Sequence, residues 1–249
     1  MQAENSRSSP AAATAENPTV AEPQAPTDLQ LFLALGLTNL PARGVVEPID
    51  RQPHPRVLIM NKGFGWSRTI EPEEWSDPEL PHVELACALA RTVAEGRPTI
   101  GMGVIPAAFG GHSLDDWMPG TTLYRSAVER ARIALKDGKL VGILWYQGPT
   151  REAPAKAADY AKRFAAMIAQ LRADLEVKFV PVIVGEIKLG ASGAALATAL
   201  AEVPQQVIPC FFVSTEGLIA ANREARLDSS ILWQFNEKFA RAWMDLAQP

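Results

Sequence analysis

Five near-continuous apolar runs alternate with helical segments, and this alternation constrains the fold more than any other feature of the chain. The runs are rich in Val, Ile and Phe, which is typical of strands that are covered on both faces. They span residues 29–36, 99–107, 139–148, 178–187 and 207–214. A shorter run at 56–61 indicates a side hairpin or an edge strand.

Between the runs, apolar residues recur at the three- and four-residue spacing of helices that bury one face. The expected helices span residues 84–96, 121–138, 156–175, 192–203 and 233–246. Strands separated by helices of this length form right-handed βαβ units. The sequence therefore predicts a doubly wound parallel sheet between two helix layers, a three-layer α/β/α sandwich. No repeat and no second core is evident, so residues 28–249 are expected to form one domain.

The N-terminal segment differs in composition from the rest of the chain. Residues 1–27 are dominated by Ala, Pro, Glu and Ser, with hardly any large apolar side chain. Such a segment cannot bury enough surface to offset its ordering entropy, so we expect a disordered leader or linker. It also lacks the apolar core of a secretory signal. If the protein is exported, the signal is expected to have been removed.

Charge and hydropathy exclude some partners. The chain of 249 residues has a formal net charge of −4, which gives no electrostatic reason to expect nucleic acid or an anionic membrane as a partner. No apolar run approaches the roughly 18 residues that a membrane-spanning helix needs. We therefore expect neither nucleic-acid binding nor a membrane span.

Cofactor and metal motifs are also missing. No cluster of Cys and His predicts a metal site, and no glycine-rich phosphate-binding motif follows the first apolar run, so no cofactor is expected. The two cysteines, Cys87 and Cys210, lie in apolar contexts. This favours two buried free thiols over a disulfide.

Ligands of doubly wound sheets bind at the carboxyl ends of the strands, so reactive groups are expected in the loops that follow them. The first loop begins with Thr38-Asn39, the second contains Gly110-Gly111, and the third run ends at Gln147. A simple structural explanation exists for each of them. Thr38 can cap a helix starting near Asn39, the glycine pair can form a turn, and Gln147 can cap loop carbonyls.

Taken together and in order, four segments resemble a known family. "LALGLTNLPARG", "IPAAFGGHSLDDW", "LYRSAVERARIAL" and "GILWYQG" are similar, in order and spacing, to the sialate O-acetylesterase-like branch of the SGNH hydrolases. This branch includes carbohydrate esterase family six, whose members remove acetyl groups from sugars or xylan. The resemblance runs from about residue 29 to 244. It implies a flavodoxin-like sheet of five parallel strands in the order 2-1-3-4-5.

The resemblance also assigns roles to positions. The family's nucleophilic serine corresponds to Thr38, and Leu37 replaces a glutamine that lines the oxyanion site. Asn39 matches the asparagine of the same block and is expected to contribute to oxyanion or ligand binding. The glycine that supplies an oxyanion N–H corresponds to Gly111, and the family's third-block glutamine corresponds to Gln147. The Glu that follows in that block is replaced by Pro149.

The family's last block, Asp-x-x-His-Phe, supplies the general base. This sequence departs most from the family pattern at that block. Anchoring the block on Asp228 places Ile231 at the histidine position, and anchoring it on Phe235-Asn236 places Gln234 there. Neither side chain can take a proton from a hydroxyl. The three histidines are His54, His82 and His112.

A hydroxyl without an adjacent base is a poor nucleophile near neutral pH. We therefore expect a member of an acetyl-ester hydrolase family that is inactive or only very weakly active. It is expected to keep a pocket for a carbohydrate or another small molecule. The alternative is a slow O-acetylesterase with Thr38 as nucleophile and His112 as substitute base. The structural alternative for His112 is packing or a hydrogen bond within its loop, with Asp115 or Asp116 nearby. Family habit and the linker-like leader favour export, and the oligomeric state is left open.

Tryptophans near the strand ends could form a sugar-stacking platform, although burial in the core is the default for each of them. They are Trp66, Trp75, Trp117 and Trp145.

Overall fold

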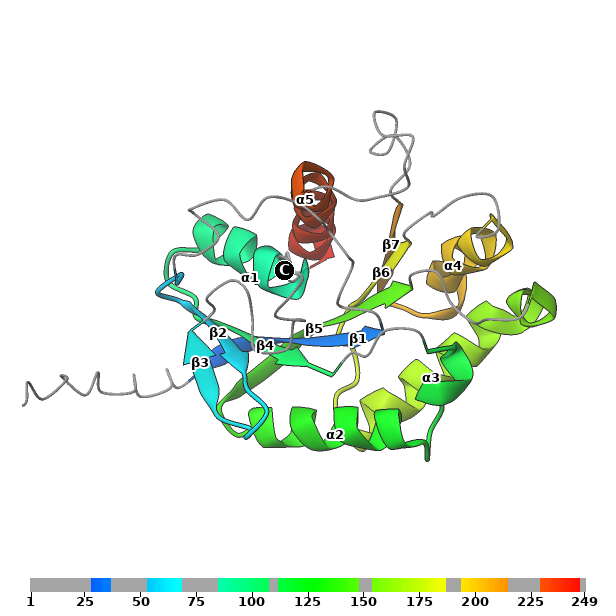
Figure 1. Cartoon of the computed structure of the whole chain (residues 1–249), viewed down its shortest axis with the longest axis horizontal. Helices are drawn as coiled ribbons and strands as arrows, with labels where there is room; N and C mark the ends of the chain where they lie inside the picture. Colours follow the sequence, from blue (N-terminus) through cyan, green and yellow to red (C-terminus); the bar gives the residue numbers. More distant parts are fainter. Residues whose placement is uncertain are drawn as a thin grey trace, which may run out of the picture.

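The computed structural model describes residues 28–36, 53–68, 85–107, 112–147, 154–186, 194–214 and 229–246, and these form an α/β domain around one sheet (Figure 1). Its strands are β1 (Leu29–Gly36), β2 (Val57–Met60), β3 (Trp66–Arg68), β4 (Met102–Pro106), β5 (Gly138–Gln147), β6 (Val182–Glu186) and β7 (Cys210–Ser214). Its α-helices are α1 (Leu85–Gly96), α2 (Thr122–Ala134), α3 (Tyr160–Asp174), α4 (Ala194–Gln206) and α5 (Ser229–Leu246). Two short 3-10 helices, η1 (Leu114–Trp117) and η2 (Pro154–Asp159), precede α2 and α3.

The sheet has seven strands in the order β3-β2-β4-β1-β5-β6-β7. The five strands of the long apolar runs lie in the order expected from the family resemblance, with β4 and β5 on either side of β1. The expected number of five strands is wrong, because the short run at 56–61 does not stay apart from the sheet. Instead β2 pairs in parallel with β4, and β3 folds back antiparallel onto β2 as the edge.

Helices cover both faces of the sheet, as predicted. In Figure 1, α1 and α5 lie above the sheet and α2 and α3 lie below it. One buried cluster joins the sheet to α1 and α5, and a larger one joins it to α2, α3 and α4. The arrangement is the predicted α/β/α sandwich.

The central strands are apolar throughout because both of their faces are buried. From Leu31 to Leu35, every side chain of β1 is at most 1% exposed. Two of the expected strands begin later than the sequence indicates. Phe179 precedes β6 and is 79% exposed, and Ile208 precedes β7 and is 75% exposed, so neither run is a strand over its full length.

The expected helices are confirmed with shifts at their ends. The first ends at Gly96 as predicted, whereas α5 begins at Ser229, four residues before the expected start. The N-terminus of α2 is capped by Thr121, whose Oγ1 accepts a hydrogen bond from the backbone N–H of Tyr124 at 3.4 Å. The predicted disorder of residues 1–27 lies outside the described residues.

Both cysteines are free thiols, as expected, with Cys87 buried and Cys210 half-buried. Burial raises the pKa of the Cys210 thiol to about 12, so this group is not a ready nucleophile. Within the described ranges, none of the helices has the length and apolar character needed to cross a membrane.

Candidate functional site at the carboxyl edge of the sheet

Three central strands bring the predicted site segments to one edge of the sheet. Because β4 and β5 flank β1 in parallel, the carboxyl ends of the three strands lie side by side. Thr38 follows the end of β1 by two residues, Gly111 follows the end of β4 by five, and Gln147 is the last residue of β5. Thr38, Asn39, Gly111 and the side chain of Gln147 lie outside the described part, so their expected convergence stays a prediction.

The last residue of β1 has to be a glycine. Gly36 has a φ of +85°, a conformation that residues with a side chain rarely adopt. A Cβ atom on it would lie 2.4 Å from the carbonyl oxygen of Tyr146 on the neighbouring strand. Gly36 therefore lets the chain leave β1 while in close contact with β5.

The aromatic residues before Gln147 are core residues. Trp145 is fully buried, and its Nε1 donates a hydrogen bond to the Tyr160 hydroxyl at 3.1 Å. Tyr146, on the opposite face, stacks on Phe239 with ring centroids 4.9 Å apart. Trp117 is 2% exposed and packs edge-to-face on Trp145. These side chains position the strand end and are not available for stacking on a sugar.

Trp66 is half-buried, and its Nε1 donates a hydrogen bond to Asp137 Oδ2 at 2.9 Å. It lies on the edge strand β3, away from the three central strand ends. The fourth tryptophan considered, Trp75, lies outside the described ranges. Within those ranges, the structure gives no support to an aromatic platform at the carboxyl edge.

The loop after β4 is organised by Asp116. Its Oδ2 accepts hydrogen bonds from the Ser113 N–H at 2.8 Å and the Ser113 hydroxyl at 3.0 Å. The pKa of Asp116 lies below its usual range, chiefly because of the hydrogen bond from the Ser113 backbone N–H. The Ser113 hydroxyl and the nearby His112 lower it further. His112 Nδ1 lies 3.6 Å from the same oxygen, a distance too long for a hydrogen bond but suited to an ion pair when the ring is protonated. His112 therefore lies beside Asp116, one of the two carboxylates expected near it, without a hydrogen bond between them.

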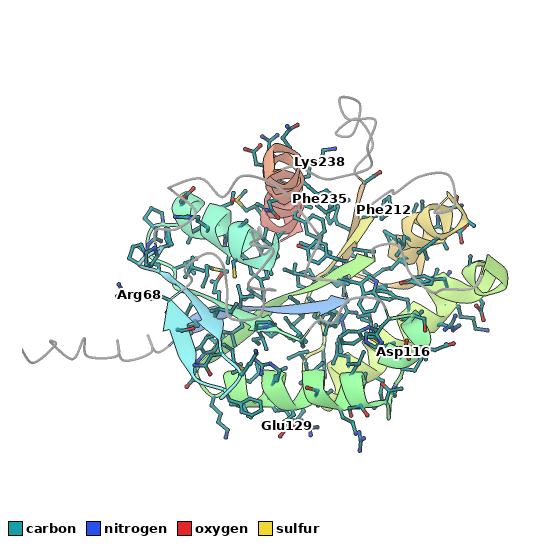
Figure 2. The ribbon with its side chains drawn as sticks, viewed as in Figure 1. Arg68, Asp116, Glu129, Phe212, Phe235 and Lys238 are labelled. Carbon is teal, nitrogen blue, oxygen red and sulfur yellow. The ribbon has the colours of Figure 1, made fainter. Side chains whose placement is uncertain are left out.

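The neighbouring carboxylate, Asp115, has a different partner. Its Oδ1 accepts a hydrogen bond from the Arg163 guanidinium of α3, and Arg163 also lies 3.7 Å from Asp159. The arginine therefore ties η1 to the start of α3, and Figure 2 shows Asp116 on this side of the sheet, near α3. Each of the two neighbouring carboxylates thus has its own partner, Arg163 for Asp115 and Ser113 for Asp116.

Replacing Asp116 by alanine is expected to lower the free energy of unfolding by about 1 kcal/mol at pH 7, because two donors of Ser113 lose their acceptor. A carboxylate with a lowered pKa stabilises the fold above the ordinary carboxyl range, and this stabilisation is lost as the pH falls through the folded-state pKa. The difference from wild type should therefore shrink below about pH 4. Urea unfolding across this pH range measures it, with the exposed Glu129→Ala as control.

His54 belongs to the opposite end of the molecule. It precedes β2, so it lies at the amino-terminal edge of the sheet, and its Nδ1 accepts a hydrogen bond from the Arg56 N–H at 3.2 Å. Burial and the charges of Arg56 and Arg91 lower the pKa of His54. His54 therefore cannot serve the carboxyl edge. His82 lies outside the described residues.

One polar position at this edge was missed by the sequence reasoning. Glu186 is the last residue of β6 and pairs in register with Gln147. A single carboxylate at the end of an apolar run belongs to no motif, so only the strand order could have identified it. In the described part of the chain, no group of three or more His, Cys, Asp or Glu residues is arranged to hold a metal ion.

The sheet order, with β4 and β5 in parallel on either side of β1 and helices on both faces, is that of a flavodoxin-like α/β/α sandwich of the SGNH-hydrolase type. The family model described as carbohydrate esterase, sialic acid-specific acetylesterase matches residues 28–245, so the chain belongs to this family. A probable carbohydrate esterase of Arabidopsis thaliana is 26% identical over 188 residues, which are 68% of this chain and 72% of that protein.

Solved structures agree in fold. An X-ray structure of an Arabidopsis thaliana protein has a TM-score of 0.72 at 21% identity and covers 88% of this chain and 99% of its own. A carbohydrate acetylesterase from Xanthomonas citri has a TM-score of 0.63 at 16% identity. That match covers 88% of this chain and 56% of the Xanthomonas protein.

Proposed function

We propose that this protein is a carbohydrate-esterase-family domain that has lost histidine-assisted ester hydrolysis and retains a pocket for a carbohydrate or another small ligand at the carboxyl edge of the sheet. The proposal rests on the positions of the histidines in the chain. None follows residue 112, although the family takes its general base from the last block. His54, which could otherwise substitute, lies at the opposite edge of the sheet.

The chemistry at the nucleophile position supports the same conclusion. In a serine hydrolase, loss of one triad member lowers the rate by several orders of magnitude and leaves only the contribution of the oxyanion hole and of binding, about 10³–10⁴ over water. Threonine adds a methyl group that restricts its rotamer and crowds the attack path. Leu37 and Pro149 replace two further polar residues of the family's blocks. All four differences act against hydrolysis.

Binding does not need the missing base. The backbone N–H expected from Gly111 does not depend on any side chain, and the amide of Gln147 remains in the sequence. We infer that these two groups, with the Thr38 hydroxyl, surround a small cavity that can hold an acetyl group, an acetate or an ordered water. The strand order supports this, because the three segments follow adjacent strands.

A slow O-acetylesterase is the second candidate, and one observation favours it. His112 lies in the loop after β4 with Asp116 Oδ2 3.6 Å from its Nδ1, and its side chain is 41% exposed. A carboxylate beside one ring nitrogen is the arrangement that orients a histidine base and leaves its other nitrogen available. In this reading, His112 takes the proton from the Thr38 hydroxyl.

Hydrolysis of a chromogenic acetyl ester separates the two candidates. We expect no turnover above that of the buffer, and no change in Thr38→Ala or His112→Ala, because no base activates the hydroxyl. His54→Ala is the matched histidine control at the opposite edge. Turnover that is abolished by Thr38→Ala and His112→Ala, but kept in His54→Ala, would establish the slow esterase and refute the loss of catalysis.

A further inference from the structure

A cavity of about 390 Å³ lies at the amino-terminal edge of the sheet, opposite the edge discussed above. Gln30 and Val141 reach it from the beginnings of β1 and β5, and Phe179 and Pro181 reach it from the segment before β6. Arg97, just after α1, and Trp243, near the end of α5, complete its wall. The volume is at the lower end of the range for small-molecule sites and suits a single ring.

Arg97 presents a cation to this cavity. Its guanidinium carbon lies 4.9 Å from the centroid of the Trp243 ring, which is itself fixed by a hydrogen bond from Nε1 to the Val141 carbonyl at 2.8 Å. Over the described ranges, no carboxylate pairs with Arg97. A guanidinium stacked on an aromatic ring keeps its N–H groups directed outward in its plane, where they can bind a carboxylate in bidentate fashion.

Gln30 adds an acceptor that has no partner. Its Oε1 is buried, and within the described part of the chain no group donates to it. An unpaired buried amide oxygen costs about 1–3 kcal/mol, so such an atom calls for a donor from outside the chain. Because Oε1 is covered in this conformation, the Gln30 amide has to turn toward the cavity that it lines before a ligand hydroxyl can donate to this oxygen.

The mouth of the cavity carries an exposed aromatic ring. Phe179 is 79% exposed, which is unusual for a phenylalanine. The chain beside it is held in place, because Arg172 Nη2 donates to the Val180 carbonyl at 2.7 Å and Nη1 donates to the Ile208 carbonyl at 3.0 Å. A fixed, exposed ring next to a polar cavity offers a flat surface on which a ligand ring can stack.

We propose that this cavity binds a small ring that carries a carboxylate and a hydroxyl group. The carboxylate pairs with Arg97, the hydroxyl donates to Gln30 Oε1, and an apolar face of the ring packs on Phe179. Sugar acids and hydroxylated aromatic acids share this chemistry. The site is separate from the carboxyl edge and does not depend on whether the protein hydrolyses esters.

Isothermal titration of the full chain with D-glucuronate, 4-hydroxybenzoate and neutral glucose tests the proposal. We expect saturable binding of at least one acid with a Kd of about 1 mM or tighter, and glucose at least about tenfold weaker, because it lacks the carboxylate. The stronger acid identifies the source, a sugar acid or an aromatic acid. Thr38→Ala should bind equally well, which separates this test from that of the esterase site.

Two substitutions locate the binding. Arg97→Met keeps a side chain on Trp243 but removes the charge, and Gln30→Leu removes the acceptor; each should weaken binding about tenfold. Arg125→Met is the matched control, because Arg125 lines another groove, on α2. If Arg97→Met does not fold, Arg97→Gln, which also removes the charge, replaces it. Absence of saturable binding up to about 10 mM, or equal affinity in the variants and the control, would overturn the proposal.

Discussion

Replacing Gly36 by alanine is expected to lower the free energy of unfolding by about 3 kcal/mol or more. Two causes act together. The φ of +85° costs a residue with a Cβ atom about 1–2 kcal/mol. The new Cβ would also lie 2.4 Å from the Tyr146 carbonyl oxygen, so the central strands β1 and β5 must shift apart in a close-packed sheet, at a cost of about 1–3 kcal/mol.

Gly120 provides the matched control for this substitution. It has a similar φ of +92°, but no atom lies within 4 Å of the position its Cβ would take. Gly120→Ala should therefore show only the conformational cost of about 1–2 kcal/mol. Guanidinium unfolding of both variants separates the two causes. If both substitutions cost the same, the close contact between Gly36 and Tyr146 does not constrain the sheet.

Most of the sheet could be predicted because a strand covered on both faces has to be apolar along its length. This rule identifies β1, β4 and β5 closely, and the family resemblance gives the order of the five long strands. The rule of apolar strands does not identify the edge strand β3. This strand, Trp66–Arg68, is three residues long and partly exposed, so its sequence carries no apolar run. Only its pairing with β2 makes it a strand.

The rule also misplaces the starts of two strands. Phe179 and Ile208 continue the apolar runs of β6 and β7 in the sequence, yet both side chains are largely exposed. Hydrophobicity alone cannot separate a buried residue from one that lies beside a cavity or at a surface. The prolines at 181 and 209, which lack a backbone N–H, were the available signal that pairing begins after them.

The candidate site is only partly accessible to sequence reasoning. Motif positions for Thr38, Gly111 and Gln147 come from the family resemblance, and the strand order places their segments side by side. The partner of His112 depends on the conformation of the loop between β4 and η1, which the sequence does not specify. Ser113 bonds to Asp116, whereas Asp115 is taken by Arg163 of α3, which lies 48 residues further along the chain.

The second large effect concerns a buried amide that the sequence does not reveal. Asn236 lies on α5, directly after Phe235. Its side chain is fully buried, and neither Oδ1 nor Nδ2 has a hydrogen-bond partner among the described residues. Burying an unpaired polar atom costs about 1–3 kcal/mol, so this side chain destabilises the fold.

Asn236→Leu is expected to raise the free energy of unfolding by about 1–3 kcal/mol, because leucine has the same number of side-chain heavy atoms and no polar group to bury. The exposed Gln234→Leu on the same helix is the control and should change stability by less than about 0.5 kcal/mol. Urea unfolding measures both variants, and a lower stability of Asn236→Leu would show that the amide has a partner, such as an ordered water, that leucine displaces.

Asn236→Asp tests the same position and is expected to lower the free energy of unfolding at neutral pH, where Asn236→Leu raises it. A carboxyl group buried without a partner has its pKa raised, because burial disfavours the charged form. Its neutral form is then favoured in the folded state, so Asn236→Asp should be most stable below about pH 4 and should lose stability relative to wild type as the pH rises towards 7. A pH-independent difference would mean that solvent reaches the side chain. Both substitutions act on one helix in the fold, so together they show whether α5 keeps an unpaired amide at the expense of stability.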